Sequence, residues 1–240
     1  MKRNIIICAP IASLWTKSRR GFTLLEILIA IFILAVVVSL VFGTFDGIFS
    51  SAEHVNESSD LSDMGNASLD RMRADLKAIH VMLYPRYTPP DADHEPDLYR
   101  IEGEPLSVGG HDTAKIRFAS LAHLPLNQDG RDGIAEIVYY ALENPDGTLD
   151  LHRADHLYPY PDFEPNPNDP VVCEQLLEYE IKYFDYDGNE YSEWNSESSS
   201  EDFNTPVAIR VKLIIGTQEN PMTFSTRIAL PTFRYKAEKK

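Results

Sequence analysis

The feature that most constrains this chain is a run of twenty-one residues, 22–42, in which Glu26 is the only charged side chain. As an α-helix the run is about 32 Å long, which matches the roughly 30 Å hydrocarbon layer of a bilayer. It is also longer than the apolar region of about 7–15 residues in a secretory signal peptide. We therefore predict one membrane-spanning helix over residues 22–42 rather than a simple cleaved signal.

The charges on either side of this run predict its orientation. Basic residues precede it, namely Lys17, Arg19 and Arg20. Acidic residues follow it, namely Asp46, Glu53, Glu57 and Asp60. Because positively charged flanks tend to stay on the cytoplasmic side, we expect a cytoplasmic N-terminus, with the rest of the chain on the other side of the membrane.

Composition and charge limit the size, the partners and the disulfides that the chain can have. The chain has 240 residues, of which 43% are hydrophobic, enough for one membrane segment and one folded domain. Its 22 basic and 37 acidic residues leave a net charge of −15, which argues against nucleic acid as a partner. The cysteines, Cys8 and Cys173, lie far apart in the chain, and Cys8 precedes the apolar run, so we expect no internal disulfide.

Glu26 needs an explanation, because an ionised side chain within a bilayer costs a few kcal/mol and usually has a function. The residues around it, Arg20-Gly21-Phe22-Thr23-Leu24-Leu25-Glu26, resemble the prepilin motif of type IV pilins and type II secretion pseudopilins. The resemblance implies that a prepilin peptidase removes residues 1–21 as a leader, cutting after Gly21. It also implies N-methylation of Phe22 and pairing of Glu26 with the N-terminal ammonium of a neighbouring subunit.

Helical spacing continues beyond the apolar run. The apolar positions that carry it are Phe45, Ile48, Phe49, Ala52, Val55, Leu69, Met72, Leu76, Ile79 and Leu83. We predict a helical spine over residues 22–84 that ends at Pro85, with its continuity left open across the polar residues 56–65. The apolar stripe of its second half is expected to pack on the folded domain.

The pattern changes after residue 85 to short runs of alternating polarity. These predict strands at 115–121, 134–142, 148–153, 176–186, 207–215 and 222–230. No long helical pattern separates them, so we predict an α+β protein whose residues 85–240 form an antiparallel β-rich domain. Stretches rich in Pro, Asp, Glu and Ser predict exposed loops at 85–97, 154–170 and 191–206.

The order of these pieces resembles the minor pseudopilin J of type II secretion systems. The resemblance implies a subunit of a short periplasmic, pilus-like fibre, anchored in the bacterial inner membrane with its C-terminal domain in the periplasm. It also implies a tip complex with the I and K subunits, contact with the major pseudopilin and contact with secreted proteins. Two alternatives remain, a type IV pilus minor pilin of the W kind and a membrane-anchored periplasmic binding protein.

We considered chemical sites and assign none as catalytic. His152 and His156 have the spacing of a helical zinc pair, but they lie at a predicted strand end, where solvated histidines are expected. Asp185, Asp187 and Asn189 are weak calcium candidates, because Gly188 falls too early for an EF-hand and a turn explains the same residues. No nucleophile or phosphate-binding motif is present, so the sequence predicts a structural protein without a cofactor.

Overall fold

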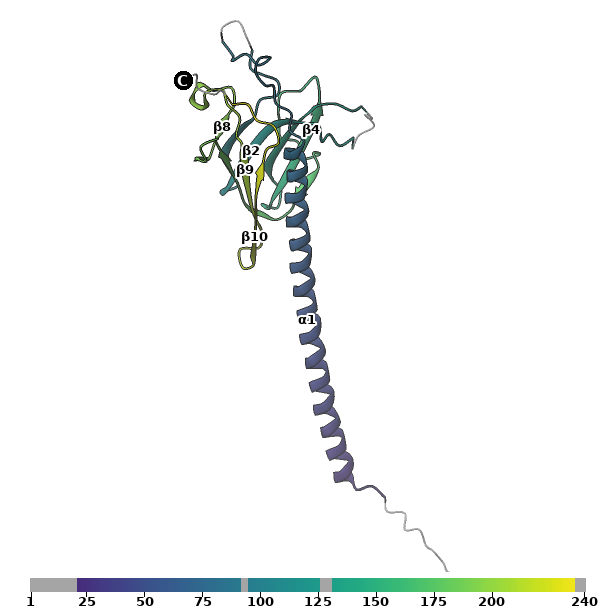
Figure 1. Ribbon diagram of the computed structural model, residues 1–240. Coiled ribbons are helices and arrows are strands. Elements are labelled where there is room, and N and C mark those ends of the chain that lie inside the picture. Colours follow the sequence, from purple (N-terminus) through teal and green to yellow (C-terminus); the bar gives the residue numbers. More distant parts are fainter. Residues whose placement is uncertain (1–20, 92–94, 126–130, 236–240) are drawn as a thin grey trace, which may run out of the picture. The chain divides into compact units, whose positions relative to one another are not determined.

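The computed structural model describes residues 21–91, 95–125 and 131–235. The chain divides into two compact units, Met1–Val55 and Asn56–Lys240. The helix α1 (Leu24–Lys77) belongs to both units (Figure 1). It is helical without interruption through residues 56–65, which answers the question of continuity that the polar residues there had left open.

Two antiparallel sheets form the second unit (Figure 1). The six-stranded sheet has the order β5 (Val171–Cys173), β4 (Leu149–Leu157), β3 (Ala135–Glu143), β2 (His111–Ser120), β1 (Glu102–Val108) and β8 (Trp194–Asn195). The four-stranded sheet has the order β10 (Pro221–Ala229), β9 (Ala208–Gly216), β6 (Leu176–Phe184) and β7 (Glu190–Tyr191). A short 3₁₀ helix, η1 (Ser199–Glu201), follows β8. These elements confirm the predicted α+β class.

Each of the six predicted strands corresponds to a strand of the structure, because each has one face that the core can bury. The clearest is β9, in which Ile209, Val211, Leu213 and Ile215 are fully buried. Four strands of the structure were not predicted. Of these, β1 contains Gly103 and Pro105 and is mostly exposed, whereas β5, β7 and β8 have only two or three residues.

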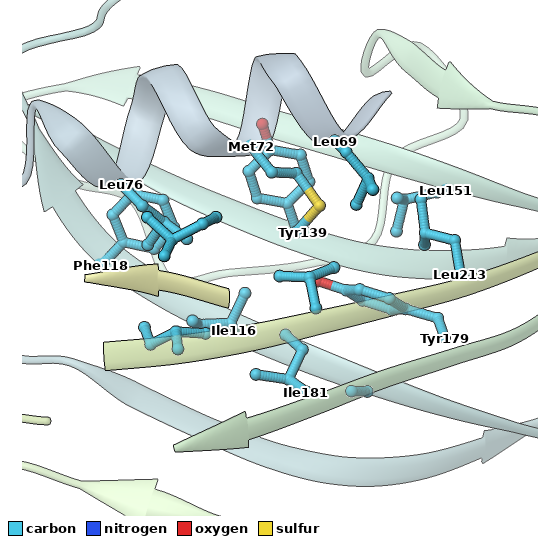
Figure 2. Close-up of a cluster of buried hydrophobic side chains, with 14 of the residues drawn as sticks. Leu69, Met72, Leu76, Ile116, Phe118, Tyr139, Leu151, Tyr179, Ile181 and Leu213 are labelled. Atoms are coloured by element: carbon cyan, nitrogen blue, oxygen red, sulfur yellow. The ribbon is translucent and has the colours of Figure 1, made fainter. Parts of the chain in front are cut away.

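The core lies between the two sheets and the second half of α1. Figure 2 shows Leu69, Met72 and Leu76 of α1 among buried side chains of both sheets. The strand residues labelled there are Ile116, Phe118, Tyr139, Leu151, Tyr179, Ile181 and Leu213. The predicted packing of the helical stripe on the folded domain is therefore confirmed.

The helix ends earlier than predicted, at Lys77 instead of just before Pro85. The next residues join the end of β2, through hydrogen bonds from His80 N–H to the Ala119 carbonyl (2.9 Å) and from Leu121 N–H to the Ala78 carbonyl (2.9 Å). Backbone groups engaged in this way cannot also continue the helical ladder. Leu83, which the stripe had included, is exposed.

A buried carboxylate, Asp75, joins α1 to the six-stranded sheet. Asp75 accepts hydrogen bonds from the Tyr139 hydroxyl (2.6 Å), Arg153 Nε (2.7 Å) and Arg71 Nη2. Both Asp75 and Arg153 are almost completely buried. Burial raises the pKa of Tyr139 to about 12, so its hydroxyl keeps its proton and donates to Asp75.

The ion network continues from Arg153 to the chain that follows β2. Arg153 Nη1 binds Asp155 at 2.6 Å, and Asp155 also accepts hydrogen bonds from Leu124 N–H (2.8 Å) and His123 Nδ1 (2.6 Å). Burial by itself would raise the pKa of Asp155, but these hydrogen bonds together lower it. The carboxylate is therefore held in its ionised form beside Arg153.

The structure corrects two predictions about β4. The strand runs to Leu157, so the first residues of the predicted 154–170 loop belong to the sheet. His152 is buried rather than solvated, with its ring stacked on Tyr140 and its Nδ1 at 2.9 Å from the Asp169 carbonyl. The alternation of β4 places His152 and Arg153 on opposite faces, and each face is covered.

A second buried ion cluster corrects the prediction of an exposed loop at 191–206. The Arg234 guanidinium lies 3.3 Å from the Tyr87 ring and donates to the Ser196 carbonyl (2.6 Å) and to Glu197 Oε1 (2.6 Å). These contacts draw the segment inward, so that Trp194, Ser196, Glu197 and Thr205 are buried. Interactions this distant in sequence leave no periodic pattern.

We predict that Asp75→Asn destabilises the folded domain by about 3–5 kcal/mol, because it removes the buried carboxylate that Arg153 and Arg71 share and, among the described residues, leaves Asp155 as the one acid beside Arg153. The matched control is Asp70→Asn on the same helix, whose ion pair with Arg73 (2.6 Å) is exposed. Removing that pair should cost about 0–1 kcal/mol. Thermal unfolding of the detergent-solubilised chain, followed by circular dichroism, measures both, and equal midpoints for the two variants would contradict this account.

Candidate functional site

The start of α1 is the candidate site, because the predicted cleavage and pairing residues meet there. Gly21, Phe22 and Thr23 precede the helix and are exposed. The Thr23 hydroxyl accepts a hydrogen bond from the Glu26 N–H (3.2 Å), as an N-cap does, so the helix begins at Leu24. The peptide bond between Gly21 and Phe22 therefore lies in exposed, non-helical backbone, which a protease can reach.

The first unit presents its apolar side chains outward. Leu24–Phe45 is long and apolar enough to cross a membrane once, and none of it is buried within the described parts of the chain. This span begins two residues later and ends three residues later than the predicted 22–42. At 1.5 Å per residue it measures about 33 Å, close to the roughly 30 Å of a hydrocarbon layer.

Glu26 lies on an apolar face of this span. A shallow groove there is lined by Phe22, Glu26, Ile27, Ala30, Ile31 and Leu34, whose spacing places them along one side of the helix. The carboxylate is in the first helical turn, where the positive end of the helix dipole favours a negative charge. The described residues place no cation beside it.

Comparison with known proteins bears on this same segment. Residues 16–42 match the family described as the prokaryotic N-terminal methylation motif. The chain carries a prepilin-type N-terminal methylation motif. It covers Gly21, Phe22 and Glu26, the three residues that the sequence had singled out.

The methylation motif accounts for a small part of the chain, and the remainder shows weaker likeness to known proteins. A solved structure, a type IV-like pilin from Thermus thermophilus, is similar over 71% of this chain and 95% of that chain. The sequence identity is 11% and the TM-score is 0.44, which is too low to carry an argument about function. No curated protein matches the sequence.

The weak calcium candidates form a turn between β6 and β7. Both carboxylate oxygens of Asp185 accept hydrogen bonds from Asn189, its N–H and its side-chain amide, each at 2.8 Å. The Tyr191 hydroxyl donates to Asp185 as well (3.0 Å), and Gly188 has a φ of +87°. Burial by itself would raise the pKa of Asp185, but the hydrogen bonds lower it. The turn that the residues predicted is thus present.

The histidine pair does not have zinc geometry. His152 and His156 both lie in β4, where four residues span about 13 Å, whereas the same spacing on a helix spans about 6 Å. Among the described residues, no group of three or more His, Cys, Asp or Glu side chains is arranged to hold a metal. Cys173 is buried and free, and burial raises the pKa of its thiol to about 11. Cys8 lies outside the described residues.

The sequence analysis did not identify the two buried ion networks around Asp75 and Arg234. The sequence does contain a sign of the Asp75 network. By helical spacing Asp75 falls on the same face as Met72 and Ile79, so it places a charge in an apolar stripe. Such an acid must find a buried partner. Nothing local identified that partner as Arg153.

We predict that Asp185→Ala destabilises the β6–β7 turn by about 1 kcal/mol, because its carboxylate organises three hydrogen bonds. The matched control is Asp187→Ala, an exposed acid two residues away in the same turn. It should leave the thermal midpoint unchanged. Melting curves with and without added calcium measure both effects, and a calcium-dependent rise in the midpoint that Asp185→Ala removes would contradict the turn interpretation.

Proposed function

We propose that this chain is a minor pseudopilin, a structural subunit of the short periplasmic fibre of a type II secretion system. The observation that carries the proposal is the methylation motif at residues 16–42, which opens an exposed apolar helix bearing one carboxylate, Glu26. In this role the chain has no catalytic function. It is a substrate of prepilin peptidase and then a building block.

The proposed processing follows from the position of the motif. Prepilin peptidase hydrolyses the peptide bond after Gly21, which releases residues 1–21 and leaves Phe22 with a free amino group. The enzyme then N-methylates that group. The segment that contains the scissile bond is exposed and non-helical, and a Cβ added at Gly21 would meet no atom within 4 Å, so nothing in the described chain shields the site.

Glu26 then has a specific partner in the fibre. It lies four positions after Phe22 in the sequence, which corresponds to about 6 Å along a helix axis. We infer that the Glu26 carboxylate of one subunit pairs with the methylated ammonium of its neighbour. The pair offsets the cost of placing each charge in an apolar surrounding, and it sets the axial register between subunits.

The proposed location has the N-terminus in the cytoplasm, the apolar span in the bacterial inner membrane and residues 85–240 in the periplasm. The finer proposal is that the chain acts as subunit J, with the I and K subunits at the fibre tip, next to the major pseudopilin and to secreted proteins. Support for it comes from the order of the helix and strands along the sequence.

We predict that co-expression with prepilin peptidase shortens the chain by residues 1–21 and adds one methyl group to Phe22. Gly21→Val should remain the full-length precursor, because the bulky side chain obstructs the cleavage position. The matched control is Gly43→Val, which also has no neighbour within 4 Å and should be processed normally. Intact mass spectrometry distinguishes these forms, and normal processing of Gly21→Val would overturn the cleavage assignment.

We also predict that the processed full chain, solubilised in detergent, co-purifies with candidate I and K subunits as a ternary complex. Glu26→Gln should be processed but recovered in the complex at least about tenfold less, since an unpaired ammonium in an apolar surrounding costs a few kcal/mol. The control is Glu57→Gln, an exposed acid on the same helix. A complex with pilus minor pilins, and none with the I and K subunits, would favour the type IV pilus alternative. A monomer that binds neither set of subunits would favour an anchored binding protein.

A further inference from the structure

The four sheet edges of the second unit differ sharply in length. Three of them are very short: β5 has three residues, and β7 and β8 have two each. The fourth edge, β10, has nine residues, and among the described residues β9 is its one partner strand (Figure 1). Natural sheets shorten their edge strands because unpaired backbone groups invite pairing with another chain. The two-residue strands β8 and β7 leave parts of β1 and β6 unpaired as well, but β10 is the longest strand whose whole outer side is unpaired within the described residues.

The alternation of hydrogen bonds identifies which backbone groups are open. Leu230 N–H bonds the Val207 carbonyl at 2.9 Å, so the residues of even number in β10 face β9. The residues between them, Thr223, Ser225, Arg227 and Ala229, direct their N–H and C=O groups away from the sheet. The ladder between β9 and β10 runs from Pro221 to Ala229 without a register shift, so no bulge interrupts this row.

The helix lies against one face of β10. A Cβ added at Gly65 of α1 would come within 2.5 Å of the Phe224 ring, whose side chain projects from the face of the sheet. On the opposite face the residues with outward backbone groups carry exposed side chains, and three of them, Thr223, Ser225 and Ala229, are small. A further strand can approach such a row closely.

The charges beside this edge indicate the chemistry of the partner. Arg227 lies directly opposite Arg210 across the ladder, an arrangement of like charges that is unfavourable unless compensated. Both guanidinium groups lie over the Phe184 ring, at 3.7 Å and 5.6 Å from its centre. Arg210 has an acid partner, Glu190, at 2.8 Å. Arg227 is exposed and has none among the residues that the structure describes, although the chain as a whole is acidic.

We propose that β10 binds an extended, acidic segment of a partner protein as an additional strand. The segment forms main-chain hydrogen bonds with Thr223, Ser225, Arg227 and Ala229, and one of its carboxylates pairs with Arg227. A second copy of this chain fits less well, because β10 contains no acidic residue that could pair with Arg227. The proposal is independent of the pilin-like role.

The test measures amide hydrogen exchange by NMR on the full chain in detergent micelles. The probes are two synthetic peptides, acetyl-Thr-Val-Glu-Val-Glu-Val-Thr-amide and the same peptide with Lys in place of each Glu. The amides of Thr223, Ser225, Arg227 and Ala229 should exchange rapidly in the free chain and slowly with the acidic peptide. The acidic peptide should bind at least about fivefold more tightly than the basic one.

Variants separate the backbone contribution from the charge. Ser225→Pro removes one outward N–H without touching the ladder to β9 and should weaken binding of the acidic peptide, whereas Ser225→Ala should not. Arg227→Glu should bind the basic peptide more tightly than the acidic one. If Ser225→Pro does not fold, this reversal is the result that tests whether the partner strand binds at β10. Equal binding of both peptides, or no protection of the four amides, would overturn the proposal. Protection that rises with protein concentration alone would also overturn it and identify a second copy as the occupant.

Discussion

The ion pair between Asp75 of α1 and Arg153 of β4 is the contact on which the second unit depends, because it determines how the helix meets the sheet. Both groups are almost completely buried; the Tyr139 hydroxyl and Arg71 also donate to Asp75, and Arg153 also donates to Asp155 and to the Ala122 carbonyl. A buried pair of this kind contributes little net stability compared with an apolar contact, but breaking it leaves a buried charge without a partner. It therefore disfavours other registers of the helical stripe, which apolar contacts alone would tolerate.

Asp75 and Glu26 are both acids on apolar faces of one helix, and they differ in where a cation for the carboxylate is found. Asp75 finds its cations within the folded domain, so its role is completed by this chain. Glu26 has no cation among the described residues, and its partner in our proposal is the N-terminus of another subunit. In our proposal, the acid without a cation among the described residues is the one through which the chain assembles.

The β-rich domain shows a comparable division between closed and open surfaces. Its cation–acid pairs are mostly internal, as with Arg234 and Glu197, or paired across neighbouring strands, as with Lys212 and Glu178 (2.6 Å). Three of its sheet edges are cut short, and Arg227 on the long edge of β10 has no acid among the described residues. An exposed edge strand and an exposed charge without a partner are surface features at which contact with other molecules is expected.

The sequence by itself determined the elements whose physics is local. A continuous apolar run predicted the long apolar helix. Period-two alternation such as Val207 to Ile215 predicted six strands, because alternation reports a buried face. The motif at Gly21, Phe22 and Glu26 was likewise readable from neighbouring residues. Only the tertiary structure decided that α1 ends at Lys77, that His152 is buried and that residues 191–206 fold inward. Those outcomes depend on partners far along the chain, such as Ala119 for His80 and Arg234 for Glu197, and contacts at that separation leave no local pattern to read.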